Sequence, residues 1–219
     1  MTVYVVSTGN APTGKEACLA SVRAQRGVDV KHIALDAAEQ HPPRGPLENL
    51  IDAMKDIPDD AIVARLDLDD RLAPRSDALQ LVERMHANGA LVTHGSFRFL
   101  DGREAPWFSR TYAPDEDVRK APWLASHLRT FRAHLFKRLR PNDFKMNGKW
   151  LDHGRDLLEM LGLIQLAWHV RVTYCPEILS LYDLAASFEF SASLEELAYE
   201  KKCVEYVRSL PPYERLASL

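Results

Sequence analysis

Short apolar runs alternate with segments of helical periodicity through the first half of the chain. Each run is bounded by turn residues, as expected of strands buried on both faces of a sheet. Between the runs, apolar residues recur every third or fourth position, which predicts amphipathic helices. The predicted strands are Val3–Val6, Val30–Leu35, Ala61–Leu66 and Ala90–His94, and the predicted helices are Gly14–Arg26, Leu47–Met54 and Ser76–Asn88.

This alternation predicts an α/β fold with a mostly parallel sheet covered by helices on both faces. Ligands of such sheets bind beyond the carboxyl ends of the strands. Thr8, Asp36 and the acidic stretch Asp67–Asp70 all follow predicted strands. The pattern therefore gathers these side chains at one edge of the sheet.

The second half of the chain has a different character. Asp101-Gly102 predicts the tight turn of a hairpin over 97–103, because Asp-Gly supplies positive φ angles. The charged and proline-rich stretch 111–123 predicts a surface loop and Pro42–Pro46 a stiff one. The predicted later elements are helices over 125–139, 155–168 and 193–210, and strands over 170–174 and 178–182. Ser193, with Glu196 three residues on, predicts the N-cap of the last helix.

Composition fits one globular unit. The chain has 219 residues, of which 46% are hydrophobic and 27% charged, and a net charge of −3 gives no overall attraction to nucleic acid or anionic membranes. Three widely spaced cysteines argue for free thiols in a reducing compartment rather than a disulfide framework or zinc site. The N-terminal segment lacks the basic residues of a secretory signal and is predicted to be the first strand. The longest apolar stretch, 161–170, is too short to span a bilayer. We therefore expect a cytoplasmic protein without a membrane span.

Asp67, Asp69 and Asp70 are the main chemical signal. Carboxylates this close repel one another unless a cation joins them, and Mg²⁺ and Mn²⁺ prefer such oxygen ligands. The alternative is a solvated turn leading into a helix that Asp77 caps.

Several stretches, in order, resemble family-2 glycosyltransferases with the GT-A fold. The acidic stretch sits in Pro58–Pro74, which resembles the family's D-x-D-D strand, including the trailing proline. The other matching pieces are Val3–Thr8, Ser21–Gln25 (S-V-x-x-Q), Asp36, His127–Phe136 and Gly154–Asp156. The resemblance covers about 2–183, but Ala37 and Ala38 stand where many members carry Asp or Ser, and the chain is short for the family.

The resemblance implies one GT-A domain over 1–219. Its parts would be a nucleotide-sugar-binding half, 1–100, an acceptor-side half, 101–190, and a C-terminal helix, 191–219. The implied reaction is inverting transfer of a sugar, with UDP as the expected nucleotide, to a hydroxyl of a glycan, lipid-linked or small-molecule acceptor. Mn²⁺ or Mg²⁺ would be the cofactor.

The resemblance also assigns roles to the acids after the third strand. Asp69, assisted by Asp67, would hold the metal against the departing diphosphate, because a divalent ion neutralises developing charge. Asp67 would also face the donor, and Asp70 would orient the loop or contact the sugar.

Further donor-binding candidates lie on other segments. Asp36 would accept hydrogen bonds from the base or ribose, although it could be a strand-end cap. Thr8 and Arg65 are included as donor-binding candidates. His127 and Arg129 would bind the diphosphate or the acceptor, and the alternative is the solvated face of an amphipathic helix.

Asp156 is the predicted catalytic base, because Gly154–Asp156 resembles the stretch that carries the base in the family. The dipole of the helix that follows would keep the carboxylate ionised. Asp152 is the second candidate, and Asp156 could instead be a first-turn acid that only stabilises the helix.

Other functions remain open. The acceptor could be a hydroxymethylated base in phage DNA. A basic cluster with aromatic residues over 137–150 could hold nucleic acid, but a solvated helix end and loop is the favoured explanation. The protein could also be a nucleotidyltransferase that makes nucleotide sugars, but the loop 8–15 only loosely imitates that class's phosphate loop. A third possibility is a non-catalytic nucleotide-sugar-binding module.

Overall fold

The computed structural model describes residues 1–9, 13–39, 45–104, 109–168, 171–183 and 192–216. At its centre is a sheet with strand order β10-β5-β7-β3-β1-β2. These strands are β1 (Thr2–Gly9), β2 (Asp29–Asp36), β3 (Ile62–Asp67), β5 (Val92–Gly95), β7 (Ser126–Arg132) and β10 (Val172–Tyr174). β7 runs antiparallel to β3 and β5, and the other pairs are parallel. The predicted mostly parallel sheet is thus confirmed.

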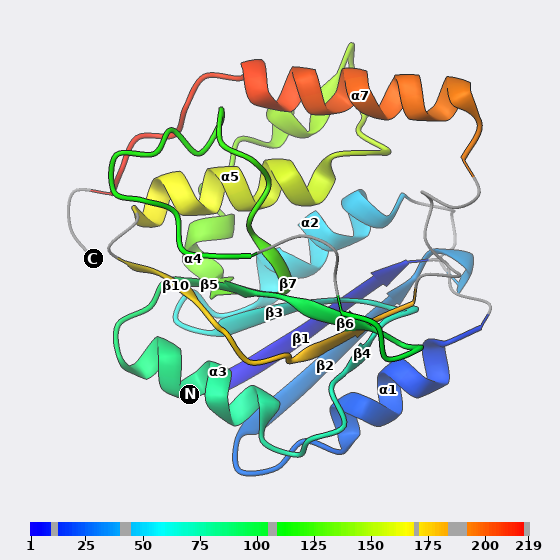
Figure 1. Cartoon of the computed structure of the whole chain (residues 1–219), viewed down its shortest axis with the longest axis vertical. Coiled ribbons are helices and arrows are strands. Elements are labelled where there is room, and N and C mark those ends of the chain that lie inside the picture. The colour runs from blue at the N-terminus through cyan, green and yellow to red at the C-terminus, as the bar shows by residue number, and fades with distance from the viewer. Residues whose placement is uncertain (10–12, 40–44, 105–108, 169–170, 184–191, 217–219) are drawn as a thin grey trace.

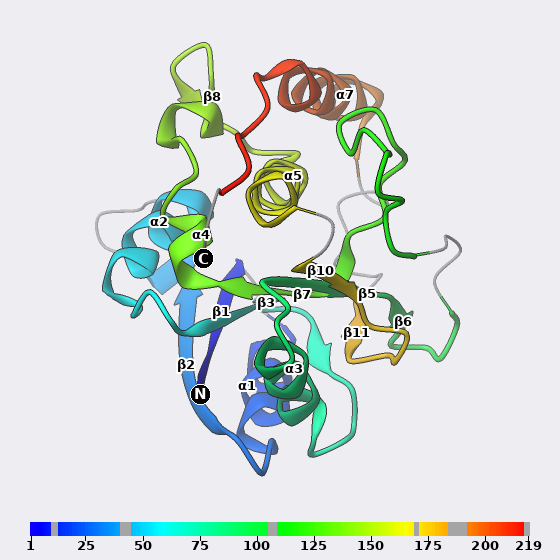
Figure 2. The ribbon, with the colours of Figure 1, turned by 90° about the vertical axis from the view of Figure 1, so that its left-hand side faces the viewer.

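Helices cover both faces of this sheet (Figures 1 and 2). α1 and α3 lie on one face, and α2, α4 and α5 on the other, with α7 as an outer layer on α5. Their bounds are α1 (Lys15–Arg23), α2 (Pro46–Asp56), α3 (Ala78–Ala87), α4 (Ala133–Phe136), α5 (Arg155–Ala167) and α7 (Leu194–Ser209). Short 3₁₀ turns are Ala37–Glu39 and Pro141–Phe144.

Strand alternation divides the core into two layers. Val3 and Val5 pack with α1 and α3, whereas Tyr4 and Val6 pack with α2 and α5. Because successive side chains of a strand point to opposite faces, a run that is apolar at every position can serve both layers.

A small second sheet borders the first. Its order is β4-β11-β6, with bounds β4 (Arg71–Leu72), β6 (Phe97–Phe99) and β11 (Ser180–Tyr182). The predicted turn is present, because the Phe99 amide donates to the Arg103 carbonyl, but of its Asp-Gly pair only Gly102 has a positive φ, 90°. The third sheet is the hairpin of β8 (Lys145–Met146) and β9 (Lys149–Trp150).

The predicted helix over 125–139 is wrong. That segment forms β7 and then the short helix α4. Leu128, Phe131 and Leu135 are spaced as on a helix, but Leu128 and Phe131 lie on opposite faces of β7. His127 and Arg129 were predicted to be possible members of a helical face, and both instead lie on this strand.

The other predicted elements are present with shifted ends. At α7, the Ser193 hydroxyl accepts from the Glu196 amide, which confirms the predicted N-cap. Residues 42–44 of the proline-rich loop and 10–12 of the loop after β1 lie outside the described residues. The three cysteines are free and buried, and no helix among the described residues has the length and apolar character needed to cross a bilayer.

Strand register brings the predicted edge residues together. Thr8 pairs with Asp67 across β1 and β3, and Gly9 pairs with Asp36 across β1 and β2. The carboxyl ends of three parallel strands therefore meet at one edge, as the sequence pattern indicated.

Candidate active site

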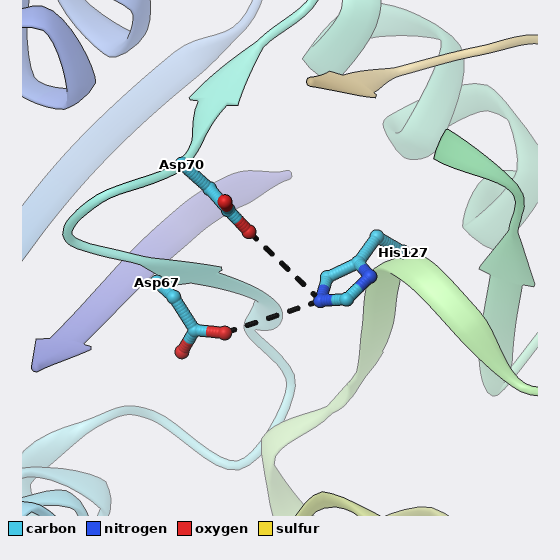
Figure 3. Close-up of side chains that lie close together, drawn as sticks. All are labelled: Asp67, Asp70 and His127. Carbon is cyan, nitrogen blue, oxygen red and sulfur yellow. Dashed lines mark ion pairs between the residues drawn. The ribbon is translucent and has the colours of Figure 1, made fainter. Parts of the chain in front are cut away.

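A tight turn after β3 positions Asp67 and Asp70. The Asp70 amide donates to the Asp67 carbonyl at 3.0 Å, and the Leu68 amide donates to the Thr8 carbonyl at 3.2 Å. Gly14 borders this turn, since a Cβ atom there would lie 3.2 Å from the Asp69 Cα atom. The turn directs the Asp67 and Asp70 carboxylates toward the same space (Figure 3).

His127 completes a three-residue group (Figure 3). Its Nε2 atom lies 3.9 Å from Asp67 Oδ2 and 4.0 Å from Asp70 Oδ2. One ligand atom from each residue lies within 4.8 Å of the others, and two carboxylates with an imidazole can hold a divalent metal ion.

Asp70 supplies the observation that tests this fit. The Asp183 amide donates to Asp70 Oδ1 at 2.9 Å, while Oδ2 is buried without a hydrogen-bond partner in the described part of the chain. A buried unpaired carboxylate oxygen is costly, so the residues fit a cation. Asp69, the predicted ligand, is not in the three-residue group, and its role stays a prediction.

The acids of the turn titrate very differently. Burial raises the pKa of Asp70 well above its usual range, and Asp67 and Asp69 raise it further. Burial and Asp67 raise the pKa of Asp69 to about 6. At Asp67 the opposing effect of desolvation is outweighed by His127, Arg129 and Arg65, so its pKa is lowered. Without a bound cation, Asp67 is therefore the most readily ionised acid of the three.

The histidine is in the form that a metal requires. Burial, and then Arg129, lower the pKa of His127 despite its acidic neighbours. A neutral imidazole nitrogen is the ligand form of histidine.

Arg129 links the acidic turn to α5. Its Nη1 atom lies 2.9 Å from Asp156 Oδ2, and its Nη2 atom lies 3.7 Å from Asp67 Oδ2. Desolvation opposes the charge of Arg129, but Asp156 and Asp67 raise its pKa overall. Asp156 lies in the first turn of α5, after Gly154, whose φ of 68° suits glycine. Its side chain is 51% exposed, so it remains open to a ligand.

A buried ion pair lies behind this contact, and sequence reasoning missed it. Arg65 Nε lies 3.4 Å from Glu159 Oε2, and the same guanidinium donates to the Val6 carbonyl and the Thr8 hydroxyl. Burial raises the pKa of Glu159, and Arg65 and then Arg129 offset part of that effect. The signal was a lone acid in the apolar run Leu157–Leu163, because acids are almost never fully buried unless paired.

A cavity of about 260 Å³ joins these parts. It is lined by predicted site residues from four segments, namely Thr8, Arg65, Asp67, His127, Arg129, Asp152 and Asp156. Tyr182 and Glu200 also line it and were not predicted. Asp36, Asp69 and Asp70 are not among the described lining residues. The Asp36 carboxylate instead accepts from Lys15 Nζ at 2.9 Å.

Comparison with known proteins gives likeness in fold. No protein-family model and no curated protein matches the chain. Solved structures of TarS from S. aureus are similar, at TM-score 0.57 and 13% identity over 94% of this chain and 42% of that chain. The complex of TarS 1–349 with UDP-GlcNAc has TM-score 0.60 and 13% identity, with 94% and 66% covered, and that with UDP has TM-score 0.51 and 13% identity, with 94% and 70% covered.

The likeness confirms the predicted fold class, a Rossmann-like α/β fold with a mostly parallel sheet flanked by helices. The chain spans 42% of the length of the longer TarS chain.

Proposed function

We propose that this chain is a metal-dependent, inverting glycosyltransferase of the family-2 type. It takes a sugar from a nucleotide diphosphate donor, with UDP as the nucleotide, and gives it to an acceptor hydroxyl. The observation that carries the proposal is the group of Asp67, Asp70 and His127. Arg129 contacts both Asp67 in this group and the exposed carboxylate of Asp156. UDP-GlcNAc and UDP occupy the TarS structures of similar fold, which supports the choice of donor.

Asp67, Asp70 and His127 would hold Mn²⁺ or Mg²⁺, with Asp69 as a further candidate ligand. Bound there, the ion supplies Lewis-acid stabilisation to the leaving diphosphate. The imidazole in the group favours Mn²⁺ over Mg²⁺, because Mg²⁺ is bound mainly by oxygen.

Asp156 is the proposed base. Its carboxylate takes the proton of the acceptor hydroxyl, and the acceptor oxygen then forms a bond to the anomeric carbon. The bond from that carbon to the β-phosphate oxygen breaks, and its electron pair leaves with the nucleoside diphosphate. Attack from the face opposite the leaving group inverts the configuration. Arg129 holds one Asp156 oxygen and leaves the other for the proton.

Thr8 and Arg65 line the proposed donor cavity. Arg65 is held by Glu159 and itself fixes the Thr8 hydroxyl, so both are positioned before donor binds. In this proposal residues 1–100 form the donor half and 101–190 the acceptor half, and α7 adds Glu200 to the cavity wall. To bind the ribose or base of the donor, Asp36 would have to release its ion pair with Lys15.

A thermal-shift experiment tests the proposal. UDP-GlcNAc and other nucleotide sugars are added with and without Mn²⁺, since a ligand bound only by the folded state raises the melting temperature. We expect a Mn²⁺-dependent rise that Asp70→Asn and His127→Ala abolish and that Glu195→Gln, an exposed acid on α7, retains. A panel without any such rise would refute the proposal. Pyrophosphate release from a nucleoside triphosphate and a sugar phosphate would indicate a nucleotidyltransferase instead.

A further inference from the structure

A second cavity opens beside the first. It measures about 290 Å³ and shares His127, Asp156, Tyr182 and Glu200 with the wall of the first. The carboxylate of Asp156 therefore faces both spaces. We call the second space the aromatic cavity, and its own lining includes Phe97, Trp123, Ser126, Leu157, Val204 and Arg208.

One wall of the aromatic cavity is a set of packed rings. The Phe97 and Tyr182 centroids lie 5.0 Å apart, and the Tyr182 and His127 centroids 5.5 Å apart. Phe97 is 2% exposed and supports Tyr182 from behind. Neighbouring rings limit the freedom of Tyr182, so little conformational entropy is lost when a ligand covers it.

Hydrogen-bonding groups share this space with the rings. They are Asp156 on α5 and Glu200 and Arg208 on α7. Arg208 Nη1 donates to the backbone carbonyls of Arg119 and Ala121, which fixes the guanidinium. The lining thus combines flat apolar surface with a few fixed polar groups, the usual composition of a small-molecule site.

We propose that the aromatic cavity is the acceptor site and that it takes a single neutral carbohydrate ring. This inference rests on the proposed function, since it assigns the acceptor to the far side of Asp156 from the donor. A sugar ring presents an apolar C–H face and a hydroxyl rim, which match the rings and the polar groups respectively. The volume lies near the lower end for ligand sites, about 300–1,000 Å³, which suits one ring.

The same lining argues against the other acceptor classes. A lipid chain is best covered by continuous apolar surface, whereas Asp156, Glu200 and Arg208 interrupt this one. A nucleic-acid backbone would place phosphates beside Asp156 and Glu200 and so meet charge repulsion. A neutral polyhydroxylated ring avoids both penalties.

Saturation-transfer NMR tests the inference with methyl β-D-glucopyranoside, methyl β-D-galactopyranoside and methyl N-acetyl-β-D-glucosaminide as probes. The full chain is used with UDP and Mg²⁺ present, because Mg²⁺ is diamagnetic and leaves the probe resonances sharp. We expect at least one probe to bind, with a Kd at least tenfold weaker in Trp123→Leu and within about threefold of wild type in Trp123→Phe, which keeps a ring. Trp168→Leu changes an exposed tryptophan outside the aromatic cavity and should bind the probe as wild type does.

The competing outcomes are separable. The inference is overturned if none of the three glycosides binds, or if Trp123→Leu binds the glycoside with the same Kd as wild type. Binding of octanol in place of a glycoside would also overturn it. UDP-GlcNAc binding with Mn²⁺ is measured on the same protein preparations without UDP. If the donor binds and no glycoside does, the acceptor assignment fails and the proposed function stands, whereas a chain that binds no donor loses both.

Discussion

Asp70 is the residue on which the proposed metal site depends most. It is 1% exposed, one oxygen accepts from a backbone amide, and the other oxygen has no partner in the described chain. Its neighbour Asp69 is less enclosed, and the backbone of Asp69 borders Gly14. The structure therefore favours Asp70 as a ligand, whereas the D-x-D-D resemblance favours Asp69.

Paired variants decide between the two acids. We expect Asp70→Asn to weaken Mn²⁺ binding at least tenfold, about 1.4 kcal/mol, because a charged ligand is lost. Asp69→Asn should change the Kd by less than about threefold. Isothermal titration with MnCl₂ measures both on the full chain, and circular dichroism confirms folding. The opposite ranking would return the ligand role to Asp69.

Much of the candidate site can be predicted from single residues. Asp67 and Thr8 follow apolar strands, so their meeting at the sheet edge follows from the fold class. Tyr182 and Glu200 could not be predicted, because only packing of β11 and α7 brings them to the cavity. Asp36 was expected to face the donor, but its pairing with Lys15 depends on side-chain reach that sequence spacing does not give.

At the scale of elements, the Arg65–Glu159 pair fastens α5 to β3. Both side chains are less than 10% exposed. Removing one member leaves a buried unpaired charge, which costs about 3–5 kcal/mol.

A double-mutant cycle tests this fastening. We expect Glu159→Leu alone to lower the unfolding free energy by about 3 kcal/mol, and Arg65→Met with Glu159→Leu to recover a large part of that loss, because the buried charge is gone. Urea denaturation provides the four free energies, of wild type, Arg65→Met, Glu159→Leu and the double variant. Additive effects of the two positions would show that the pair is not coupled.

The elements themselves were largely predictable, and β7 shows where the prediction failed. A strand that lines a site carries inward polar side chains, here His127 and Arg129, which mask its alternation of apolar and polar positions. The run continues directly into α4, so the combined apolar spacing is typical of a helix. Only its pairing with β3 and β5 reveals the strand, and pairing depends on residues more than thirty positions away.

At the scale of the whole molecule, buried neutral histidines make stability depend on pH. Burial, and then Arg132, lower the pKa of His86 to about 3, and its Nε2 atom lies 2.8 Å from the Thr130 hydroxyl. Its unfolded pKa is about 6.5. Between these values the unfolded chain binds the extra proton, so the contribution of His86 to stability is present above pH 6.5 and falls as the pH is lowered.

His86→Gln isolates this contribution, since glutamine does not titrate and can still bond Thr130. We expect the unfolding free energy of wild type relative to the variant to fall by about 2 kcal/mol from pH 7 to pH 5. Urea titrations at each pH measure it. Acids with raised pKa values, such as Asp70 and Glu159, act in the opposite direction but cancel in the difference. A flat difference would contradict the burial of a neutral imidazole.

The insertion of β7 between β3 and β5 has a consequence for the order of folding. β3 is complete at Asp67, but its neighbour on that side begins only at Ser126. During synthesis the chain must carry an apolar, unpaired strand edge until β7 emerges, and such edges invite association with other chains. His127 and Arg129 lie on the same strand that closes this edge, so the proposed catalytic centre is completed at the same time as the strand edge is protected from aggregation.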